Sequence, residues 1–322
     1  MQNLVTVFGG SGFIGTQVVR ALAKQGWRVR VAVRQPHLAY AMRLQGDVGQ
    51  VDVVQANVRN EASVLRALDG AAACVNLVGV LYESGRQKFQ TLHVMGARTV
   101  AAAAKAKGVT HFVQMSALGA DPESPSKYAR TRAAGEAAVR GILPQAVVIR
   151  PSVVFGHGDN FFNRFAELAK ISPVLPLIGG GATRFQPVFL GDVARAVTLA
   201  LGDAWAGKTL ELGGPAVLTF RELMEIVVAE TGRKRFLVPL PFPAASLIGM
   251  GGDILATIGL PPPLTTDQVE LLKADNVVSG AFPTLGDMGI AGTTVESTVG
   301  QYLYRFKKGG QFADQPERIV SV

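Results

Sequence analysis

The sequence has few of the residues that build disulfide frameworks and metal cages. Cys74 is the only cysteine, which excludes a disulfide framework and any cysteine-based zinc or iron–sulfur site. The four histidines lie far apart without the H-x₃-H spacing of metal ligands, so no metal is expected. They are His37, His93, His111 and His157. With 322 residues, 48% of them apolar, the chain is long enough to bury a large hydrophobic core.

Long apolar runs and blocks of like charge are also missing. The longest uncharged stretch, Phe236–Gly252, contains three prolines and is shorter than the ~20 apolar residues of a membrane span. The segment MQNLVTVFGG has no basic leader, so no signal peptide is expected. The net charge of +8 permits attraction to phosphates, anionic lipid or an acidic partner. Because no run of five or six cations occurs, a nucleic-acid partner is not expected.

What the sequence does contain is an alternation of short apolar segments and segments of helical period. Strands are predicted at Leu4–Phe8, Arg28–Val33, Val51–Val54, Ala73–Leu77, His111–Met115 and Ala146–Ile149. Helices are predicted at Phe13–Gln25, Glu61–Leu68, Phe89–Lys107 and Ser126–Arg140. Strands separated by helices of this length predict an α/β fold, a Rossmann-type doubly wound parallel sheet.

The alternation loosens after Pro151, which indicates a second region. We expect residues 1–155 and 184–212 to form the dinucleotide-binding domain. Residues 156–183 and 213–322 would form a smaller, mostly helical region for a substrate or partner. Later elements are predicted as helices Phe161–Lys170, Asp192–Leu201 and Phe220–Glu230, and as strands Arg184–Leu190 and Thr209–Leu212. Ile171–Ala182 is predicted to be a Gly/Pro-rich connection, and the tail from Arg233 shows no α/β alternation.

A glycine-rich turn follows the first predicted strand and opens a helix at once. Glycines spaced three apart in such a turn let the backbone approach a pyrophosphate, which binds free N–H groups at the helix start. The strand-to-helix context favours this function over an ordinary glycine-rich turn. The predicted cofactor-binding residues here are Gly9, Ser11, Gly12, Phe13, Ile14 and Gly15.

The end of the second predicted strand indicates which coenzyme is bound. NAD-binding proteins have a carboxylate there for the ribose hydroxyls, whereas this sequence has Arg34. A guanidinium pairs well with a 2′-phosphate, so Arg34 favours NADP(H). The alternative is an arginine that is simply solvated. Asn57, after the third strand, could contact the adenine, and Gly79 would let the coenzyme pass closely over the fourth strand.

Ser116, Tyr128 and Arg132 are the candidate catalytic set, and each could also contact the coenzyme. Tyr128 and Arg132 lie four apart and share one helix face. With Gly9–Gly15, this set resembles the short-chain dehydrogenase/reductase superfamily in its extended or atypical branch. That family has a lysine four residues after the tyrosine, whereas here Arg132 keeps the charge with a different geometry. Reductase chemistry, cofactor binding without turnover, and simple packing of Tyr128 all remain open.

Further segments narrow the resemblance. Arg150–Gly156 resembles the sixth-strand motif of the extended enzymes, and it implies that Pro151 and Val153 pass the nicotinamide. Gln186–Ala194 resembles their substrate-side strand and helix start, with Asp192 as a candidate N-cap. Ser126–Glu136 and Pro261–Val278 are similar to the nucleotide-binding accessory subunits of respiratory complex I and their bacterial relatives. The similarity runs from Val5 to about Val278 and is weak beyond it.

That resemblance implies a subunit that binds NADPH, docks on the complex I peripheral arm near the membrane surface, and is generally regarded as non-catalytic. Its location would be peripheral, on the cytoplasmic side of a bacterial inner membrane or on the mitochondrial matrix side. The predicted helix Ala244–Leu260 carries an apolar stripe at helical spacing, and Arg233–Arg235 precedes it. The stripe could lie in a bilayer interface or against a partner, or it could pack on the protein's own core. The stripe comprises Leu247, Gly251, Ile254, Leu255 and Ile258.

Three functions therefore remain open from the sequence. The first is an NADP(H)-binding accessory subunit of NADH:quinone oxidoreductase with a structural or sensing coenzyme. The second is an active reductase of a hydrophobic carbonyl, such as a quinone or isoprenoid precursor, with Phe161 and Phe162 as walls of the substrate pocket. The third is a redox-sensing regulator that works in solution with a protein partner. His157 in the same loop is interpreted as an ordinary loop residue.

Overall fold

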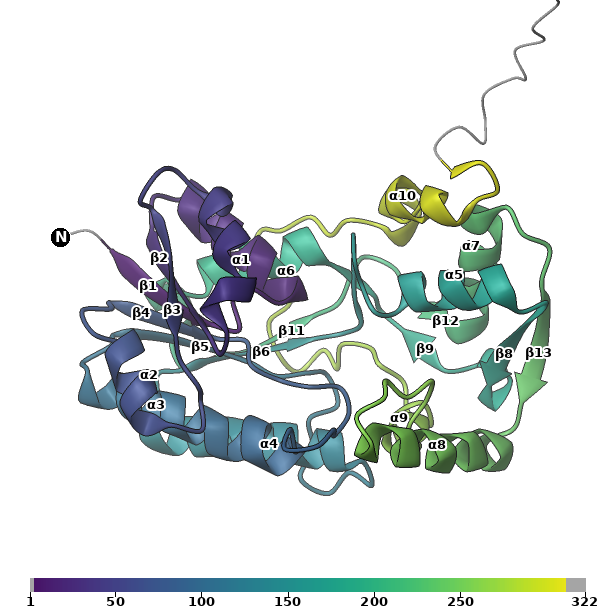
Figure 1. The fold of residues 1–322 in the computed structure, drawn as a ribbon, viewed down its shortest axis with the longest axis horizontal. Coiled ribbons are helices and arrows are strands. Elements are labelled where there is room, and N and C mark those ends of the chain that lie inside the picture. Colours follow the sequence, from purple (N-terminus) through teal and green to yellow (C-terminus); the bar gives the residue numbers. More distant parts are fainter. Residues whose placement is uncertain (1–2, 311–322) are drawn as a thin grey trace, which may run out of the picture.

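The computed structural model describes residues 3–310 and shows a parallel seven-stranded sheet beside a smaller region (Figure 1). The strand order is β11-β6-β5-β4-β1-β2-β3. The strands are β1 (Leu4–Phe8), β2 (Arg28–Val33), β3 (Val51–Gln55), β4 (Ala73–Asn76), β5 (His111–Met115), β6 (Val147–Pro151) and β11 (Thr209–Leu212). The chain reverses direction across the sheet between β1 and β4, the kind of switch point where such sheets bind ligands. The predicted doubly wound sheet is confirmed.

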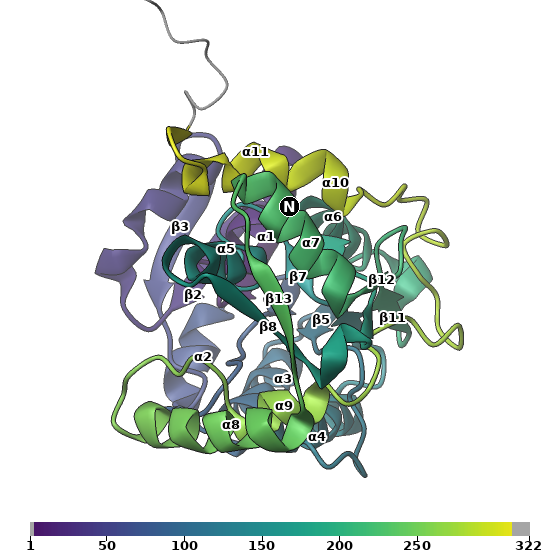
Figure 2. The same ribbon diagram turned by 90° about the vertical axis from the view of Figure 1, so that its right-hand side faces the viewer.

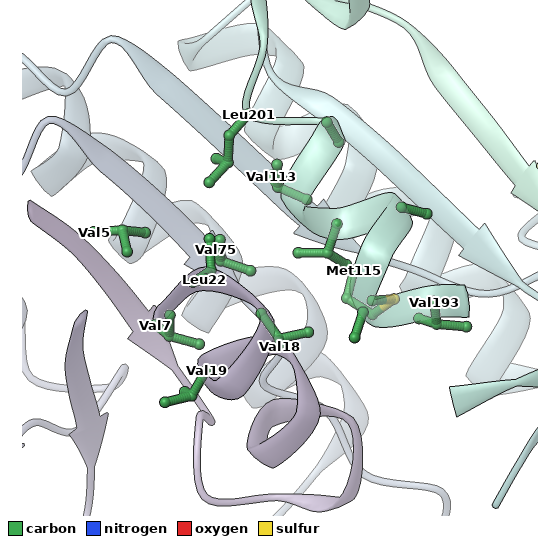
Figure 3. Packing of buried hydrophobic residues seen from close by; sticks show 14 of the residues in the cluster. Val5, Val7, Val18, Val19, Leu22, Val75, Val113, Met115, Val193 and Leu201 are labelled. Carbon is green, nitrogen blue, oxygen red and sulfur yellow. The ribbon is translucent and has the colours of Figure 1, made fainter. Parts of the chain in front are cut away.

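Helices cover both faces of the sheet. On one face lie α1 (Phe13–Lys24) and α6 (Leu190–Leu199), and on the other α2 (Glu61–Ala67), α3 (Ala97–Ala106) and α4 (Lys127–Ile142) (Figure 1). Figure 3 shows Val18 and Leu22 of α1 packed with Val7 of β1 and Val75 of β4. The central strands β1 and β4 are buried at nearly every position, as expected of a parallel sheet that is covered on both faces, whereas β2 and β3 toward the edge carry exposed Arg28 and Asp52. Two 3₁₀ turns, η1 (Pro36–Leu38) and η2 (Tyr40–Gln45), connect β2 to β3.

The predicted helix over Phe89–Lys107 divides into two parts. Its first part, η3 (Gln90–Gly96), has π-helical hydrogen bonding, and α3 follows directly. Gly135 of α4 makes room for this turn, since a Cβ there would overlap the carbonyl oxygen of His93. π-Helical turns are often found at functional sites. This one brings His93 between α4 and the segment after β4.

The smaller region has its own buried cluster and contains strands that the sequence pattern did not predict. Its helices are α5 (Phe162–Ile171), α7 (Phe220–Thr231), α8 (Phe242–Thr257), α9 (Thr266–Leu271), α10 (Val295–Thr298) and α11 (Gly300–Leu303). A parallel pair joins β8 (Val174–Ile178), within the predicted connection, to β13 (Phe236–Leu240), within the tail. Each of these strands contains a proline, Pro176 or Pro239, which argues against a strand when the sequence is read alone.

The predicted strand Arg184–Leu190 is wrong as a single element. It divides into β9 (Arg184–Phe185), antiparallel to β12 (Leu218–Thr219), and β10 (Val188–Phe189), parallel to β7 (Val154–Phe155). Pro187 lies between the two pieces and has no N–H for a continuous ladder. Asp192 is not the N-cap of α6, because that helix begins at Leu190 after Phe189. The Asp192 carboxylate instead accepts a hydrogen bond from the backbone of Thr293 at 2.7 Å.

We retain as a proposal the division into residues 1–155 with 184–212, and 156–183 with 213–322. The buried cluster around Phe155, Phe162 and Phe220 supports a separate smaller core. The late segment also returns to the sheet, where Leu285 and Ile290 join the cluster beneath α1 and α6. Residues 311–322, assigned to the smaller region from the sequence, lie outside the described residues.

Helix α8 packs through a face of small residues and exposes its large ones. Figure 2 shows it along the lower edge of the smaller region, beside α9. The buried positions are Ala245, Gly249, Gly252 and Ala256. The exposed positions include Leu247 (70%), Ile248 (47%), Met250 (58%), Ile254 (67%) and Ile258 (67%). The alternative that the apolar stripe packs on the protein's own core is therefore wrong. Within residues 3–310, no helix has both the length and the apolar character that a membrane crossing requires.

Two adjacent glycines of α8 test this packing. A Cβ at Gly252 would overlap the carbonyl oxygen of Leu264, whereas a Cβ at Gly251 meets nothing within 4 Å. Gly252→Ala should lower the free energy of unfolding by about 1–3 kcal/mol, since the α8–α9 contact must open. Gly251→Ala should raise it by up to about 1 kcal/mol through helix propensity. Urea unfolding measures both, and equal effects of the two variants would contradict this packing.

Candidate functional site

The turn between β1 and α1 is built to bring backbone amides close to a ligand. Gly9 has a positive φ of 76°, which favours glycine, and Gly12 is the N-cap of α1 in an extended conformation. A Cβ at Gly15 would overlap the carbonyl oxygen of Gly9, so only glycine lets the helix start so close to the strand. The first amides of α1, which include those of Phe13 and Ile14, have no acceptor within the helix. An anion at this position would satisfy them.

A cavity of about 260 Å³ opens beside this turn at the carboxyl ends of β1 to β4. Its lining includes Gly9, Ser11, Gly12, Arg34, Asn57, Arg59, Gly79 and Gln87. The structure thus brings together six of the predicted cofactor-binding residues around one cavity. No carboxylate lies among the residues that line it. Arg34 is exposed, and it forms no hydrogen bond or ion pair with any residue of the described range 3–310.

Arg132 lies next to this cavity, with its guanidinium against Gly79, one of the residues that line it. A Cβ at Gly79 would come within 2.9 Å of the guanidinium carbon, so this glycine gives Arg132 its space. Arg132 is only 9% exposed and donates from Nη1 to the carbonyl oxygen of Met115 at 3.3 Å, while its Nε is buried without an acceptor. Among residues 3–310 no carboxylate pairs with it. A buried cation without a counter-charge is costly, which favours a bound group with acceptor oxygens here.

Tyr128 packs beneath this guanidinium. The guanidinium carbon of Arg132 lies 5.1 Å from the centre of the Tyr128 ring, a cation–π contact. The rings of Phe89 and His93 meet Tyr128 edge-on at 5.6 and 5.4 Å. The hydroxyl of Tyr128 makes no hydrogen bond within residues 3–310, so it is free to meet a ligand. The arginine thus lies over the ring face, and it is not bonded to the hydroxyl.

Ser116 is placed differently from the other two predicted catalytic residues. Its hydroxyl donates to Oε1 of Glu136, a residue of α4, at 2.5 Å. Glu136 also accepts two hydrogen bonds from Arg150, at 2.9 and 2.7 Å. Glu136 is 4% exposed, so the serine belongs to a buried ion-pair cluster that joins β5, α4 and β6. The structure brings Tyr128 and Arg132 together and shows no hydrogen bond from Ser116 to either, within the described residues.

His93 is a site residue that the sequence pattern did not single out. The backbone N–H of Val80 donates to its Nε2 at 3.2 Å, and its Nδ1 lies 3.1 Å from the hydroxyl of Thr131. These partners assign a neutral ring with the proton on Nδ1. Burial, together with the nearby charge of Arg132, lowers the pKa of His93 to about 2. A neutral histidine thus fastens the segment after β4 to α4.

The segment Pro261–Val278 holds the start of α4. Asp267 of α9 accepts hydrogen bonds from the hydroxyl of Ser126 (2.9 Å) and from the backbone amides of Lys127 (2.6 Å) and Tyr128 (3.2 Å). A carboxylate at a helix N-terminus also interacts favourably with the helix dipole. One carboxylate from the smaller region therefore positions the helix that carries Tyr128 and Arg132.

The same segment also holds the end of β6. Ser152 donates to Oδ1 of Asn276 at 2.7 Å, and the backbone amide of Val153 donates to the same atom at 3.2 Å. Pro151 ends β6, and its carbonyl oxygen accepts from Leu118 at 3.0 Å. The structure therefore places Pro151 and Val153 at the junction of the sheet and the smaller region.

The predicted pocket walls Phe161 and Phe162 have a different role. Phe162 is 0% exposed and Phe161 packs with it at 5.2 Å between ring centres, inside the core of the smaller region. The expectation that Phe162 faces a substrate is therefore wrong, because α5 begins at this residue and turns it inward. His157 is exposed in the loop after β7, as expected of a loop residue.

The residues present fit a bound dinucleotide. Free amides at the start of α1 suit a diphosphate, and Arg34 and Arg59 offer cations at the cavity. Arg132, packed against Gly79, has unused donors. By contrast, no cluster of three or more His, Cys, Asp or Glu side chains in the described residues could hold a metal ion. Arg59 and Asp267 were not predicted. Arg59 follows Asn57 by two residues, and the contact of Asp267 spans about 140 residues of sequence.

The neutral state of His93 predicts a pH dependence of stability. The unfolded chain binds a proton at this residue below its ordinary pKa of 6.5, whereas the folded chain does not until about pH 2. Stability from this group is therefore complete above pH 6.5, and it falls by up to about 1.4 kcal/mol per pH unit below it. His93→Gln should remove that contribution to the slope between pH 4.5 and 6, measured by urea unfolding. His37→Gln, at an exposed position, is the matched control; an unchanged slope in His93→Gln would contradict the assignment.

The chain is similar to proteins of a known family. Residues 5–213 match the NAD dependent epimerase/dehydratase family. The mitochondrial NADH dehydrogenase (ubiquinone) 1 alpha subcomplex subunit 9 of Arabidopsis thaliana is 36% identical over 316 residues, covering 95% of this chain and 79% of its own. The ceramide reductase of Caulobacter vibrioides is 32% identical over 253 residues, 77% of each chain.

A solved structure supports the same fold. The NADPH-dependent quinone oxidoreductase of Escherichia coli, complexed with NADPH, superposes with a TM-score of 0.72 at 24% identity, covering 93% of this chain and 99% of that one. Identity at this level supports the fold alone. The chain belongs to the NAD dependent epimerase/dehydratase family and is a homologue of the mitochondrial NADH dehydrogenase (ubiquinone) 1 alpha subcomplex subunit 9 proteins.

Proposed function

We propose that the chain is an NADP(H)-binding accessory subunit of proton-pumping NADH:quinone oxidoreductase, in which the coenzyme has a structural or sensing role. The observation that carries this proposal is the placement of Arg132 over the face of Tyr128. In the reductases that the sequence resembles, a lysine at this position lowers the pKa of the tyrosine. In this chain the cation at that position is a guanidinium over the face of the ring, and within residues 3–310 it makes no hydrogen bond to the hydroxyl. The similarity to subunit 9 over 95% of the chain supports the same conclusion.

The coenzyme would act as part of the folded structure. The turn Gly9–Gly15 binds the diphosphate, and Arg132 supplies donors to the ribose near the nicotinamide. A ligand that binds only the folded state stabilises it by about 2.7 kcal/mol when present at a hundredfold excess over its Kd. The coenzyme would contact the carboxyl ends of β1 to β4 and Arg132 of α4, so its occupancy would stabilise this edge of the sheet.

The exposed face of α8 is the proposed contact with the membrane surface. Its large exposed side chains are aliphatic or methionine, and Asp253 is its only charged residue. An apolar face of this kind suits the boundary of a bilayer. We infer a peripheral position, on the cytoplasmic side of a bacterial inner membrane or the matrix side of a mitochondrion, next to the peripheral arm of the oxidoreductase.

An active reductase of a hydrophobic carbonyl is the second candidate. The unbonded hydroxyl of Tyr128 favours it, together with 32% identity to a ceramide reductase. The tyrosine would donate a proton to the carbonyl oxygen, while the bound coenzyme supplies the hydride to the carbon and gives an alcohol. Steady oxidation of NADPH with a long-chain ketone or a quinone, lost in Tyr128→Phe, would establish this function in place of the first.

Arg34 should determine the choice of coenzyme. Arg34→Glu replaces attraction for the 2′-phosphate with repulsion, so it should weaken NADPH binding by at least about tenfold more than NADH binding. Isothermal titration with both coenzymes measures the ratio. Equal losses for NADPH and NADH would mean that Arg34 does not read the phosphate.

Purification from gently solubilised membranes tests the proposed assembly. The tagged chain should be recovered with subunits of NADH:quinone oxidoreductase. The double variant Leu247→Glu, Ile254→Glu should move the chain to the soluble fraction. Contact of α8 with the bilayer would then bury two carboxylates, which is unfavourable. Leu44→Glu, at an 83% exposed position of η2, is the matched control and should behave as the wild type.

Two outcomes would contradict this assignment. Recovery of the wild-type chain from the soluble fraction, free of respiratory subunits, would favour the redox-sensing regulator. Retention of the α8 double variant on membranes would show that another surface makes the contact.

A further inference from the structure

We propose that Arg59 is a second specificity residue, which together with Arg34 binds the 2′-phosphate of the coenzyme. This inference rests on the proposed NADP(H) function and adds a residue beyond the strand end that usually distinguishes the coenzymes. Arg59 lines the same cavity as Arg34, and both side chains are exposed at its rim. A phosphate monoester carries close to two negative charges at pH 7. One guanidinium would leave it half neutralised, whereas two match its charge.

The sheet brings the ends of β2 and β3 together at one edge of the cavity. β2 and β3 are parallel neighbours, with Val33 registered on Gln55, and the backbone of Ala56 donates to the carbonyl oxygen of Val33 at 2.8 Å. Adjacent strands lie about 4.8 Å apart. Arg34, the first residue after β2, therefore lies beside the start of the turn that carries Arg59. A phosphate on the adenosine ribose at this edge of the sheet comes within reach of both side chains.

Hydrogen bonds already hold Arg59 in place. Its backbone N–H donates to Oδ1 of Asn57 at 3.1 Å, which fixes the turn after β3. Its Nη1 donates to the carbonyl oxygen of Arg86 at 3.2 Å, in the segment Leu81–Lys88, whose Gln87 lines the cavity. That segment is itself held by hydrogen bonds between Ser84 and Gln87.

The hydrogen bond to Arg86 holds the guanidinium of Arg59 and leaves most of its N–H donors available. A guanidinium has five N–H donors, and the carbonyl oxygen of Arg86 engages only one of them. The remaining donors are available to a phosphate. Among residues 3–310 no carboxylate pairs with Arg59 or Arg34, so nothing in the described part of the chain competes for their charge.

Titration of purified Arg59→Gln with NADPH and with NADH tests the inference. NADPH should bind about tenfold more weakly than to the wild type, while NADH should change by less than about twofold, because only NADPH carries the extra phosphate. Arg59→Lys keeps the charge and should recover most of the NADPH affinity. Arg66→Gln removes an exposed arginine of α2 that does not line the cavity, and it should leave both affinities unchanged.

The outcomes separate this inference from the proposed function. If Arg59→Gln binds NADPH as well as the wild type does, or loses NADPH and NADH affinity equally, Arg59 does not read the phosphate. Arg34 would then be the only one of the two arginines assigned to the 2′-phosphate. If the wild type binds NADH as tightly as NADPH, or binds neither, the proposed NADP(H) function fails first. Thermal unfolding of each variant without coenzyme shows whether a lost affinity reflects a lost fold.

Discussion

The contact of Gly15 with the carbonyl oxygen of Gly9 brings the start of α1 directly against the end of β1. This close approach determines where the first free amides of α1 point, and the cavity at the ends of β1 to β4 forms around them. The other lining residues surround that turn, with Arg34 and Arg59 on the side of β2 and β3 and Gly79 on the side of β4. A larger residue at position 15 would separate helix from strand and move the whole phosphate site.

The second constraint is a charge buried without a partner. Arg132 is held by the face of Tyr128, the carbonyl oxygen of Met115 and the open side of Gly79. None of these neutralises a guanidinium. Asp267 of α9 holds the backbone at the start of α4, one turn before Arg132, and does not pair with the Arg132 side chain. In the proposed function, a coenzyme that the protein retains neutralises this buried charge.

The sheet could be predicted from the sequence because its signals are local. The alternating valines of β1 and β2, and the glycines between β1 and α1, lie within a few residues of the features that they determine. The candidate site was predictable only in part. The partners of Ser116, Tyr128 and Arg132 lie on other elements, so residue spacing along one helix could not show that Ser116 bonds to Glu136. The small residues of α8 likewise gave no sign that they, and not the leucines and isoleucines, would be buried.

The most direct test of a retained coenzyme is the nucleotide content of the protein as isolated. The chain is purified without added coenzyme and denatured, and the released nucleotides are separated and identified by mass spectrometry. A coenzyme that forms part of the folded structure predicts stoichiometric NADP(H) in the released fraction. Protein that is folded but releases no dinucleotide, or releases NAD(H) instead, would contradict the account.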